Sequence, residues 1–225
     1  MAVPNEYNII GGLLGLGPDI LLAILTEMIL VPDAVQLVGV NYPISIHNPD
    51  PFDIVFTDID EVQKKISKHI NKYNTVSLTQ VLESGIWQME AVFQNTRNRS
   101  CIGIVEDSYI IPAGALPWIS PHQEHMITYN GAGQPFSISA KGKSFGGNAY
   151  FYDFRIIRLE MDCDKGTLTF FFNDVQQPLY ISGINEKVRF IIFIYWPESS
   201  CIIRSLKKLA TPTSQRLANE KAIQW

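Results

Sequence analysis

The sequence predicts a mainly β protein, an antiparallel β-sandwich with a short helical segment before it. Many short apolar runs are separated by turns rich in Gly, Pro, Asn and Asp, which is typical of antiparallel sandwiches. Residues 155–173 read as a complete β-hairpin with Gly166 in its turn. The chain has 225 residues, of which 46% are hydrophobic and 18% are charged. A chain of this length can bury a core that needs no disulfides or metals for stability.

The N-terminal segment, from about residue 9 to residue 43, is expected to form two short helices. Pro18 suits the first turn of a helix, and a run of Ile and Leu follows over 20–29. Pro32 then starts a second helix, which runs to Val40. The apolar residues cover more of the helix circumference than one buried face requires. We therefore expect this segment to pack on another surface, in its own chain or in another protein.

The next stretch, residues 44–75, is expected to connect the helices to the sheet. A strand is possible over 52–56. Residues 62–70 fit a helix face and β structure equally well, so both remain open. Lys64, Lys65, Lys68 and Lys72 are most simply a solvated face, because a nucleic-acid patch would need more charge and interleaved aromatic residues.

The region from about residue 75 to residue 207 is expected to be sheet. Alternation of apolar and polar side chains predicts strands over 87–93, 155–162 and 167–173. The apolar, β-branched run 188–195 predicts a central strand, and 201–206 is expected to return beside it. The polar tail after Leu209 is expected to be frayed or to form a short exposed helix.

The distribution of charge divides the chain into two parts. Residues 1–63 contain no Lys or Arg and nine acidic residues, whereas the remainder holds all 18 basic residues against 13 acidic ones. The longest uncharged N-terminal run, 7–18, is too short for a membrane-spanning helix, and no basic region suits a secretory signal. The three cysteines are far apart in apolar contexts and are expected to be reduced thiols. A soluble, cytoplasmic protein is expected.

Four stretches, taken in order, resemble a SPRY domain. They are VSLTQVLESGIWQMEAVF, SCIGIV, IIRLEMDCDKGTLTFFFNDVQQPLY and VRFIIFIYWPESSCIIRSLKKL. Each is a common amphipathic pattern, but the four in this order and at this spacing are specific. The resemblance implies a bent, concanavalin-like sandwich of two antiparallel sheets, with long loops at one edge. It also implies a non-enzymatic adaptor that binds short peptides or folded partner proteins.

The resemblance places the recognition loops at 95–99, 113–125, 141–148 and 195–199. Arginines in a polar turn can bind carboxylates or carbonyls, and aromatic residues beyond strand ends are common interface anchors. The alternative for such aromatic residues is that they cap the core. The expected partner-binding residues are Asn95, Arg97, Arg99, Trp118, His122, Tyr195 and Trp196.

The N-terminal segment resembles an F-box, although Gly17 and Tyr42-Pro43 depart from the family pattern. That resemblance implies docking to a Skp-type adaptor of a cullin ubiquitin ligase, and hence a substrate-recognition subunit of an SCF-type ligase. The alternative is a stand-alone SPRY module whose helices pack on the sandwich. The residues that would contact the adaptor are Pro18, Leu21, Leu22, Ile24, Leu25, Met28, Val35 and Leu37.

Motifs for catalysis and for metal binding are absent from the sequence. The pair His122 and His125 lacks metalloprotease spacing, and no nucleophile or phosphate-loop motif is present. We expect no enzyme activity, cofactor, metal, nucleic-acid partner or membrane partner. A lectin-like carbohydrate-binding sandwich remains an alternative, although the acidic Ca²⁺ cluster common in such lectins is not found. The expected divisions are 1–45, an F-box-like segment; 46–74, a connector and the start of the sandwich; 75–209, the SPRY domain; and 210–225, a tail.

Overall fold

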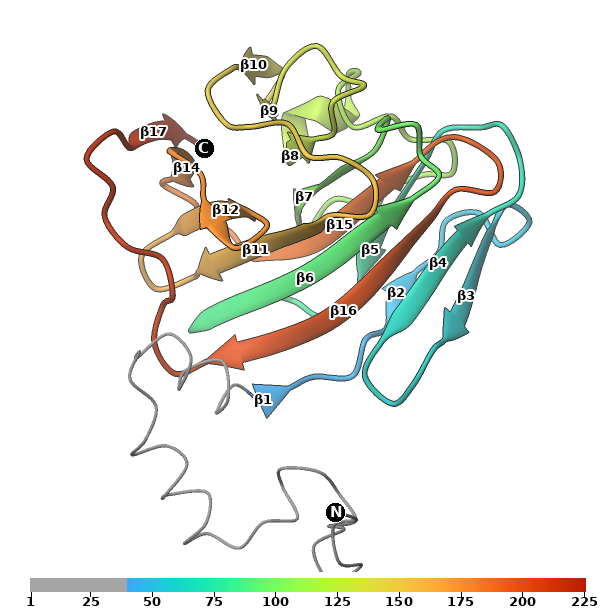
Figure 1. Ribbon diagram of the computed structural model, residues 1–225, viewed down its shortest axis with the longest axis horizontal. Helices are drawn as coiled ribbons and strands as arrows, with labels where there is room; N and C mark the ends of the chain where they lie inside the picture. The colour runs from blue at the N-terminus through green and yellow to red at the C-terminus, as the bar shows by residue number, and fades with distance from the viewer. Residues whose placement is uncertain (1–39) are drawn as a thin grey trace, which may run out of the picture. The chain divides into compact units, whose positions relative to one another are not determined.

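The protein is described from a computed structural model that places residues 40–225, and these residues form two packed β-sheets (Figure 1). Sheet A has ten strands, in the order β17-β14-β12-β11-β6-β16-β4-β3, with β1 beside β16 and β13 beside β12. Sheet B has seven, in the order β10-β9-β8-β7-β15-β5-β2. All pairings between these strands are antiparallel except that of β14 with β17. The predicted mainly β, antiparallel architecture is confirmed.

The strands of sheet A are β1 (Val40–Asn41), β3 (Ile54–Asp58), β4 (Lys64–Lys68), β6 (Ile86–Gln94), β11 (Ile156–Asp162), β12 (Thr167–Phe172), β13 (Val175–Gln176), β14 (Leu179–Ser182), β16 (Ser200–Leu209) and β17 (Lys221–Gln224). Those of sheet B are β2 (Ile46–His47), β5 (Asn74–Leu78), β7 (Cys101–Glu106), β8 (Met126–Asn130), β9 (Ile138–Ala140), β10 (Lys143–Phe145) and β15 (Val188–Ile194). A 3₁₀ turn, His122–His125, precedes β8. No helix within residues 40–225 is long and apolar enough to cross a bilayer.

The predicted hairpin is β11–β12. Its alternation places Ile157, Leu159 and Met161 in the core between the sheets. At the turn, Gly166 has a φ of +63°, and a Cβ there would lie 2.4 Å from a backbone oxygen of Ile184. Only glycine combines this left-handed backbone with so close an approach. Each fully buried Ile or Leu contributes about 1.5–3 kcal/mol relative to an exposed one, so the sandwich core is the main source of stability.

Strand β15 lies inside sheet B between β5 and β7, which confirms the predicted central strand. The strand that follows it, β16, does not pair with it, so the expectation for 201–206 is wrong. Instead the chain crosses to sheet A, where β16 pairs with β6 and β4. The connection from β6 to β7 makes the same crossing in the opposite direction. Because β6 neighbours β16 and β7 neighbours β15, the two crossing loops must run side by side.

Two expectations about the start of the chain are affected by the structure. Val40–Asn41 is a strand paired with Lys207 and Lys208 of β16, so the second helix does not extend to Val40 as predicted. The remainder of the helical segment lies outside the described residues. Residues 62–70, for which both helix and β structure remained open, contain the strand β4 at 64–68, which pairs with both β3 and β16.

The C-terminal tail is neither frayed nor helical, which corrects the prediction for the residues after Leu209. Strand β17 extends sheet A alongside β14, and Ile223 joins the core. Before it, Thr213 and Ser214 donate backbone N–H groups to the carboxylate of Glu160, at 3.0 and 2.9 Å. The polar face of β11 is therefore buried as well, with Glu160 only 1% exposed.

All three cysteines lie within the described residues and are free thiols, as expected. Cys101 and Cys201 are buried, and Cys163 is partly buried. Burial, helped by the neighbouring carboxylates of Asp164 and Asp162, raises the pKa of Cys163 to about 12. A thiol with so high a pKa is almost entirely protonated at neutral pH and is therefore a poor nucleophile.

Candidate partner-binding surface

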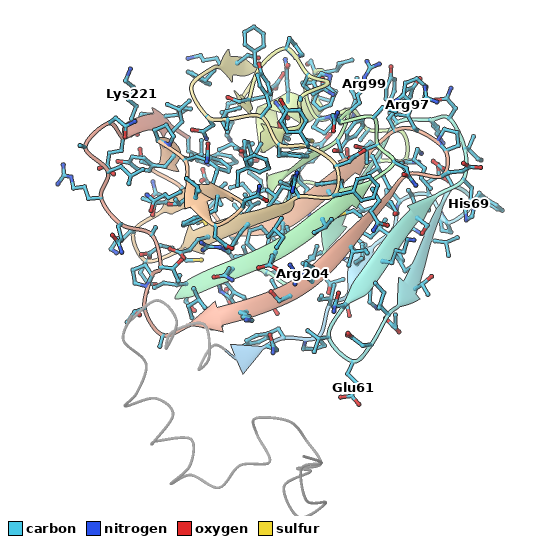
Figure 2. All side chains as sticks on the ribbon, in the orientation of Figure 1. Glu61, His69, Arg97, Arg99, Arg204 and Lys221 are labelled. Atoms are coloured by element: carbon cyan, nitrogen blue, oxygen red, sulfur yellow. The ribbon has the colours of Figure 1, made fainter. Side chains whose placement is uncertain are left out.

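The two crossing loops bring together four of the residues predicted to bind a partner. The guanidinium carbon of Arg97 lies 4.4 Å from the ring centre of Trp196, and that of Arg99 lies 5.3 Å from the ring centre of Tyr195. The Tyr195 and Trp196 rings meet edge to face at 4.6 Å. We call Arg97, Arg99, Tyr195 and Trp196 the arginine–aromatic cluster. Figure 2 shows both arginines at the same corner of the molecule.

The turn that carries the arginines is held by hydrogen bonds to Asp153. Asn95, Arg97 and Asn98 have φ values of 57°, 54° and 58°, so the turn repeatedly enters the left-handed region. The carboxylate of Asp153 accepts hydrogen bonds from the backbone N–H of Thr96 at 2.7 Å and from the Thr96 hydroxyl at 2.5 Å.

The same turn is tied to Asp153 a second time. The side-chain oxygen of Asn98 accepts the backbone N–H of Asp153 at 2.9 Å, and the Asn98 carbonyl accepts the N–H of Gly133. Thr96 and Ser100 are buried and share a hydrogen bond. These contacts keep the backbone of 95–100 in one conformation while the Arg97 side chain remains exposed.

The loop that carries the aromatic residues is held by β4. The backbone N–H of Glu198 donates to the carbonyl of Lys68 at 2.9 Å, and the N–H of Lys68 donates to the carbonyl of Ser199 at 3.0 Å. The hydroxyl of Ser199 also donates to the carbonyl of Trp196. Trp196 is itself half-buried, and its indole Nε1 has no acceptor within residues 40–225.

Beneath this loop lies a buried ion pair between Lys68 and Asp53. Both side chains are at most 1% exposed. The Asp53 carboxylate also accepts the backbone N–H groups of His69 and Ile70, at 3.2 and 2.7 Å. Burial lowers the pKa of Lys68, and the contact with Asp53 opposes that shift. Removing one member of such a pair is strongly destabilising, because the other charge stays buried without its partner.

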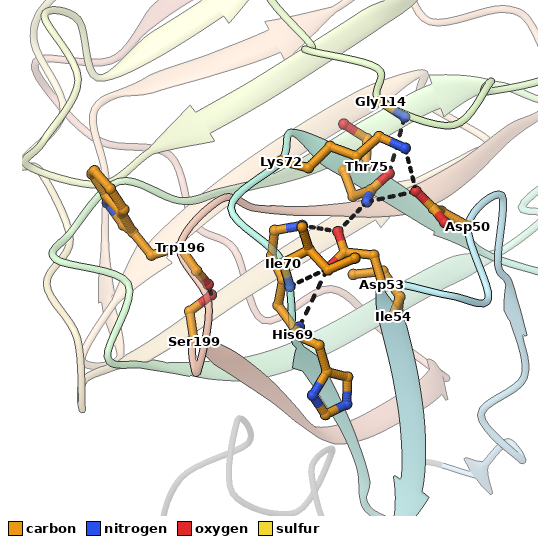
Figure 3. A network of polar contacts seen from close by, with 12 residues as sticks. Asp50, Asp53, Ile54, His69, Ile70, Lys72, Thr75, Gly114, Trp196 and Ser199 are labelled. Carbon is orange, nitrogen blue, oxygen red and sulfur yellow. Dashed lines mark hydrogen bonds and ion pairs between the residues drawn. The ribbon is translucent and has the colours of Figure 1, made fainter.

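The polar network continues to a third recognition loop, 113–125. Asn74 donates to Asp53 at 2.5 Å, and its side-chain oxygen accepts the N–H of Gly114 at 3.0 Å. Asp50 accepts from Lys72 at 2.6 Å (Figure 3). The hydrogen bond from Lys72 lowers the pKa of Asp50 and outweighs burial, which raises it. The network thus anchors loops from three parts of the chain.

Trp118, from that third loop, lies beside the cluster but packs largely on the core. Its ring meets Phe193 edge to face at 4.9 Å, and both Tyr73 and Tyr195 pack on the same buried residues. The capping role that was the alternative for these aromatic residues therefore applies in part. Trp118 also lines an open pocket of about 210 Å³, together with Gln123, Asn130, Phe136, Ala140, Lys143 and Ser144. The last two come from the predicted loop 141–148.

His122 lies outside the arginine–aromatic cluster. Its Nδ1 is 2.6 Å from the Tyr109 hydroxyl, and burial, with a smaller effect from His125, lowers its pKa. His125 in turn contacts the carboxylate of Glu106 at 2.7 Å. No group of His, Cys, Asp and Glu within residues 40–225 has the arrangement of a metal site. Asn95 is exposed at the start of the arginine turn.

Three contributors to this surface were not predicted from the sequence. Tyr73 stacks on Tyr195 with ring centres 4.7 Å apart. Asp153 holds the arginine turn, and next to it Phe154 is 63% exposed with a φ of 62°. The aromatic run 150–154 could have indicated these exposed residues, because its side chains do not alternate between apolar and polar as those of a half-buried strand do. The pairing of Asp153 with Thr96 had no local signal.

The predicted adaptor-binding residues Pro18, Leu21, Leu22, Ile24, Leu25, Met28, Val35 and Leu37 lie outside the described residues. The F-box resemblance therefore remains a prediction from sequence.

The comparisons with known proteins agree on the fold. No family model and no curated protein sequence matches the chain. Among solved structures, the SPRY domain of human HERC1 is similar with a TM-score of 0.53 and 10% identity, over 73% of this chain and 99% of that one. The PSpry domain of TRIM65 is similar with a TM-score of 0.51 and 10% identity, over 76% and 93%. Stonustoxin is similar with a TM-score of 0.52 and 13% identity, over 76% of this chain and 28% of that one. The predicted SPRY-type fold is confirmed, and likeness at this identity concerns the fold alone.

Proposed function

We propose that this protein is a non-enzymatic interaction module that binds a partner protein through the arginine–aromatic cluster. The observation that carries the proposal is the stacking of Arg97 on Trp196 and of Arg99 on Tyr195 across two rigidly held loops. Trp, Tyr and Arg are the residues most enriched among the energetically dominant contacts of protein interfaces.

The support beneath the cluster also favours a binding role. The loops are anchored by polar contacts of the partly buried Asp153 and of the buried Lys68 and Asp53 rather than by the exposed residues themselves. A surface that is ordered before binding loses less conformational entropy when a partner docks. The SPRY-type fold raises the expectation further, because SPRY domains act as adaptors that recognise peptides or folded proteins.

The finer proposal is that the protein is a substrate-recognition subunit of an SCF-type ubiquitin ligase. Its support is the F-box-like pattern from Pro18 to Leu37 and the surplus of apolar residues there. Co-purification with a Skp-type adaptor tests it. The double substitution Leu21→Asp and Leu25→Asp should abolish that co-purification while leaving the sandwich folded. Unchanged recovery of the adaptor would refute the F-box proposal without affecting the interaction module.

The test of the module is capture of partner proteins by the full chain from a cell extract. The variant carrying Arg97→Ala and Trp196→Ala should lose the captured partners, because each hot-spot truncation typically costs about 2 kcal/mol or more of binding free energy. Arg204→Ala is the matched control, since Arg204 lies on the outer face of sheet A and pairs with Glu90 (Figure 2). If the double variant captures the same partners as wild type, the proposed surface is wrong. Hits on a glycan array that depend on Trp196 would favour the carbohydrate alternative instead.

A further inference from the structure

The arginines of this protein fall into two groups according to their ion pairs. Four of the seven lie 2.9–3.7 Å from a carboxylate oxygen of another residue, namely Arg158, Arg189, Arg204 and Arg216. Arg97 and Arg99 form no ion pair and no side-chain hydrogen bond with any residue of the described part, 40–225, and neither does Arg155. The guanidiniums of the cluster are therefore ordered by aromatic rings and not by acids.

This mode of ordering leaves their hydrogen-bonding capacity unused. A guanidinium has five N–H donors in its plane, whereas a cation–π contact uses only its face. Stacking on Trp196 and Tyr195 restricts the Arg97 and Arg99 side chains without occupying a single donor. Planar donors of this kind match the two oxygens of a carboxylate, which they bind as a bidentate pair.

The acidic residues of the neighbouring segments do not use the guanidinium donors of the cluster. Asp153, which holds the arginine turn, accepts hydrogen bonds from Thr96 on both of its carboxylate oxygens. In the aromatic loop, Glu198 is the only acidic residue. The described residues 40–225 carry 18 basic and 18 acidic side chains, so the domain as a whole is neutral.

We propose that the partner is an acidic protein segment, in which an Asp or Glu carboxylate is bound by Arg97 and Arg99 beside an apolar side chain that packs on Trp196. This inference deepens the proposed function and rests on it. Nucleic acid fits the same arginines less well, because binding along a phosphate backbone draws on many cations in a stripe, and this corner offers only a few.

The probe for this inference is a display library of random linear peptides, selected against the full chain. Peptides whose binding is lost in Trp196→Ala should be enriched in Asp and Glu. In such a peptide, replacing the acid by its amide should weaken binding by roughly ten- to hundredfold, the range expected for a hydrogen bond between charged groups. The variant Arg97→Gln with Arg99→Gln should show a similar loss, and raised salt should reduce wild-type affinity. Arg204→Gln serves as the control arginine and should bind normally.

The outcomes separate this inference from the function on which it rests. Trp196-dependent peptides without acidic enrichment, bound equally well by the double glutamine variant, would overturn the acidic partner and leave the interaction surface intact. A library that yields no Trp196-dependent peptide would overturn the acidic linear segment, and loss of captured partner proteins in the Arg97→Ala, Trp196→Ala variant would still support the interaction surface. Trp196-dependent binding of a single-stranded oligonucleotide that acidic peptides fail to displace would also overturn the acidic protein segment.

Discussion

Arg97 and Trp196 form a cation–π contact at 4.4 Å, although they belong to loops at distant points of the chain. The contact follows from the topology of the sandwich. Arg97 lies where the chain passes from β6 in sheet A to β7 in sheet B, and Trp196 lies where it returns from β15 to β16. Because the strands on either side are hydrogen-bonded neighbours, the two loops lie next to each other. The candidate site is therefore a direct product of the two sheet crossings.

Truncation of Trp196 should cost less stability than truncation of its buried neighbour. Trp196 is half-buried, whereas Phe193 is fully buried beneath the cluster. We expect Phe193→Ala to lower the free energy of unfolding by about 3–5 kcal/mol, and Trp196→Ala by about half of that or less. Urea denaturation of the two variants measures both values. Equal losses would show that Trp196 is a core residue and would weaken its assignment to the interface.

At position 154, replacement of Phe154 by glycine should give a more stable protein than replacement by alanine. Its φ of 62° lies in the left-handed region, which costs a residue with a Cβ about 1–2 kcal/mol. The ring is 63% exposed, so removing it loses little packing. We expect Phe154→Gly to be more stable than Phe154→Ala by up to about 1 kcal/mol, because part of the relief is offset by the greater entropy of glycine in the unfolded chain. An alanine variant that is the more stable of the two would contradict the backbone strain.

Thr213 should matter for stability, although it lies in the polar tail. Its hydroxyl and N–H both donate to the buried carboxylate of Glu160, and Arg158 donates to the same hydroxyl at 2.7 Å. Thr213→Val keeps the shape but removes the hydroxyl, and should cost about 1–3 kcal/mol of unfolding free energy. The control is Thr211→Val, an exposed position without a side-chain hydrogen bond in the described structure, which should change stability by less than about 0.5 kcal/mol. Similar values for both variants would contradict the role of the tail.

Asp50 should make stability depend on pH in the acidic range. Its pKa in the folded protein is below the ordinary value of 3.8, chiefly because Lys72 donates a hydrogen bond to it. The unfolded chain therefore takes up this proton at a higher pH than the folded protein. The contribution of Asp50 to the free energy of unfolding is fully present above about pH 5. It is lost as the pH falls through 3.8 toward the lower pKa of Asp50 in the folded protein.

The variant Asp50→Asn removes this carboxylate, so its stability should fall less steeply below pH 5 than that of wild type. Urea midpoints measured from neutral to acidic pH test the difference. Glu61→Gln is the control for the loss of one acid, because Glu61 is exposed (Figure 2). If the stability of Asp50→Asn falls with decreasing pH as steeply as that of wild type, the contact between Asp50 and Lys72 in the folded protein would be contradicted.

Local pattern was sufficient where a strand has one apolar face and a short turn. The β11–β12 hairpin and β15 were predicted within a few residues for this reason. The same reasoning failed for β16, because alternation reports which face of a strand is buried but not which neighbour it pairs with. It failed for the C-terminal tail as well, where a polar sequence forms β17 by using the free edge of β14.

By itself, the sequence determined the class of the fold, the core strands and the identity of Arg97, Arg99, Tyr195 and Trp196 as candidate contacts. Residue type and spacing carry that information, since they reflect local burial and turn geometry. Only the tertiary structure decided that these four residues form one cluster, that Asp153 and Lys68 hold it, and that His122 lies apart. Those relationships depend on pairing between strands that are far apart in the sequence. The sequence of one strand does not indicate which distant strand it will pair with.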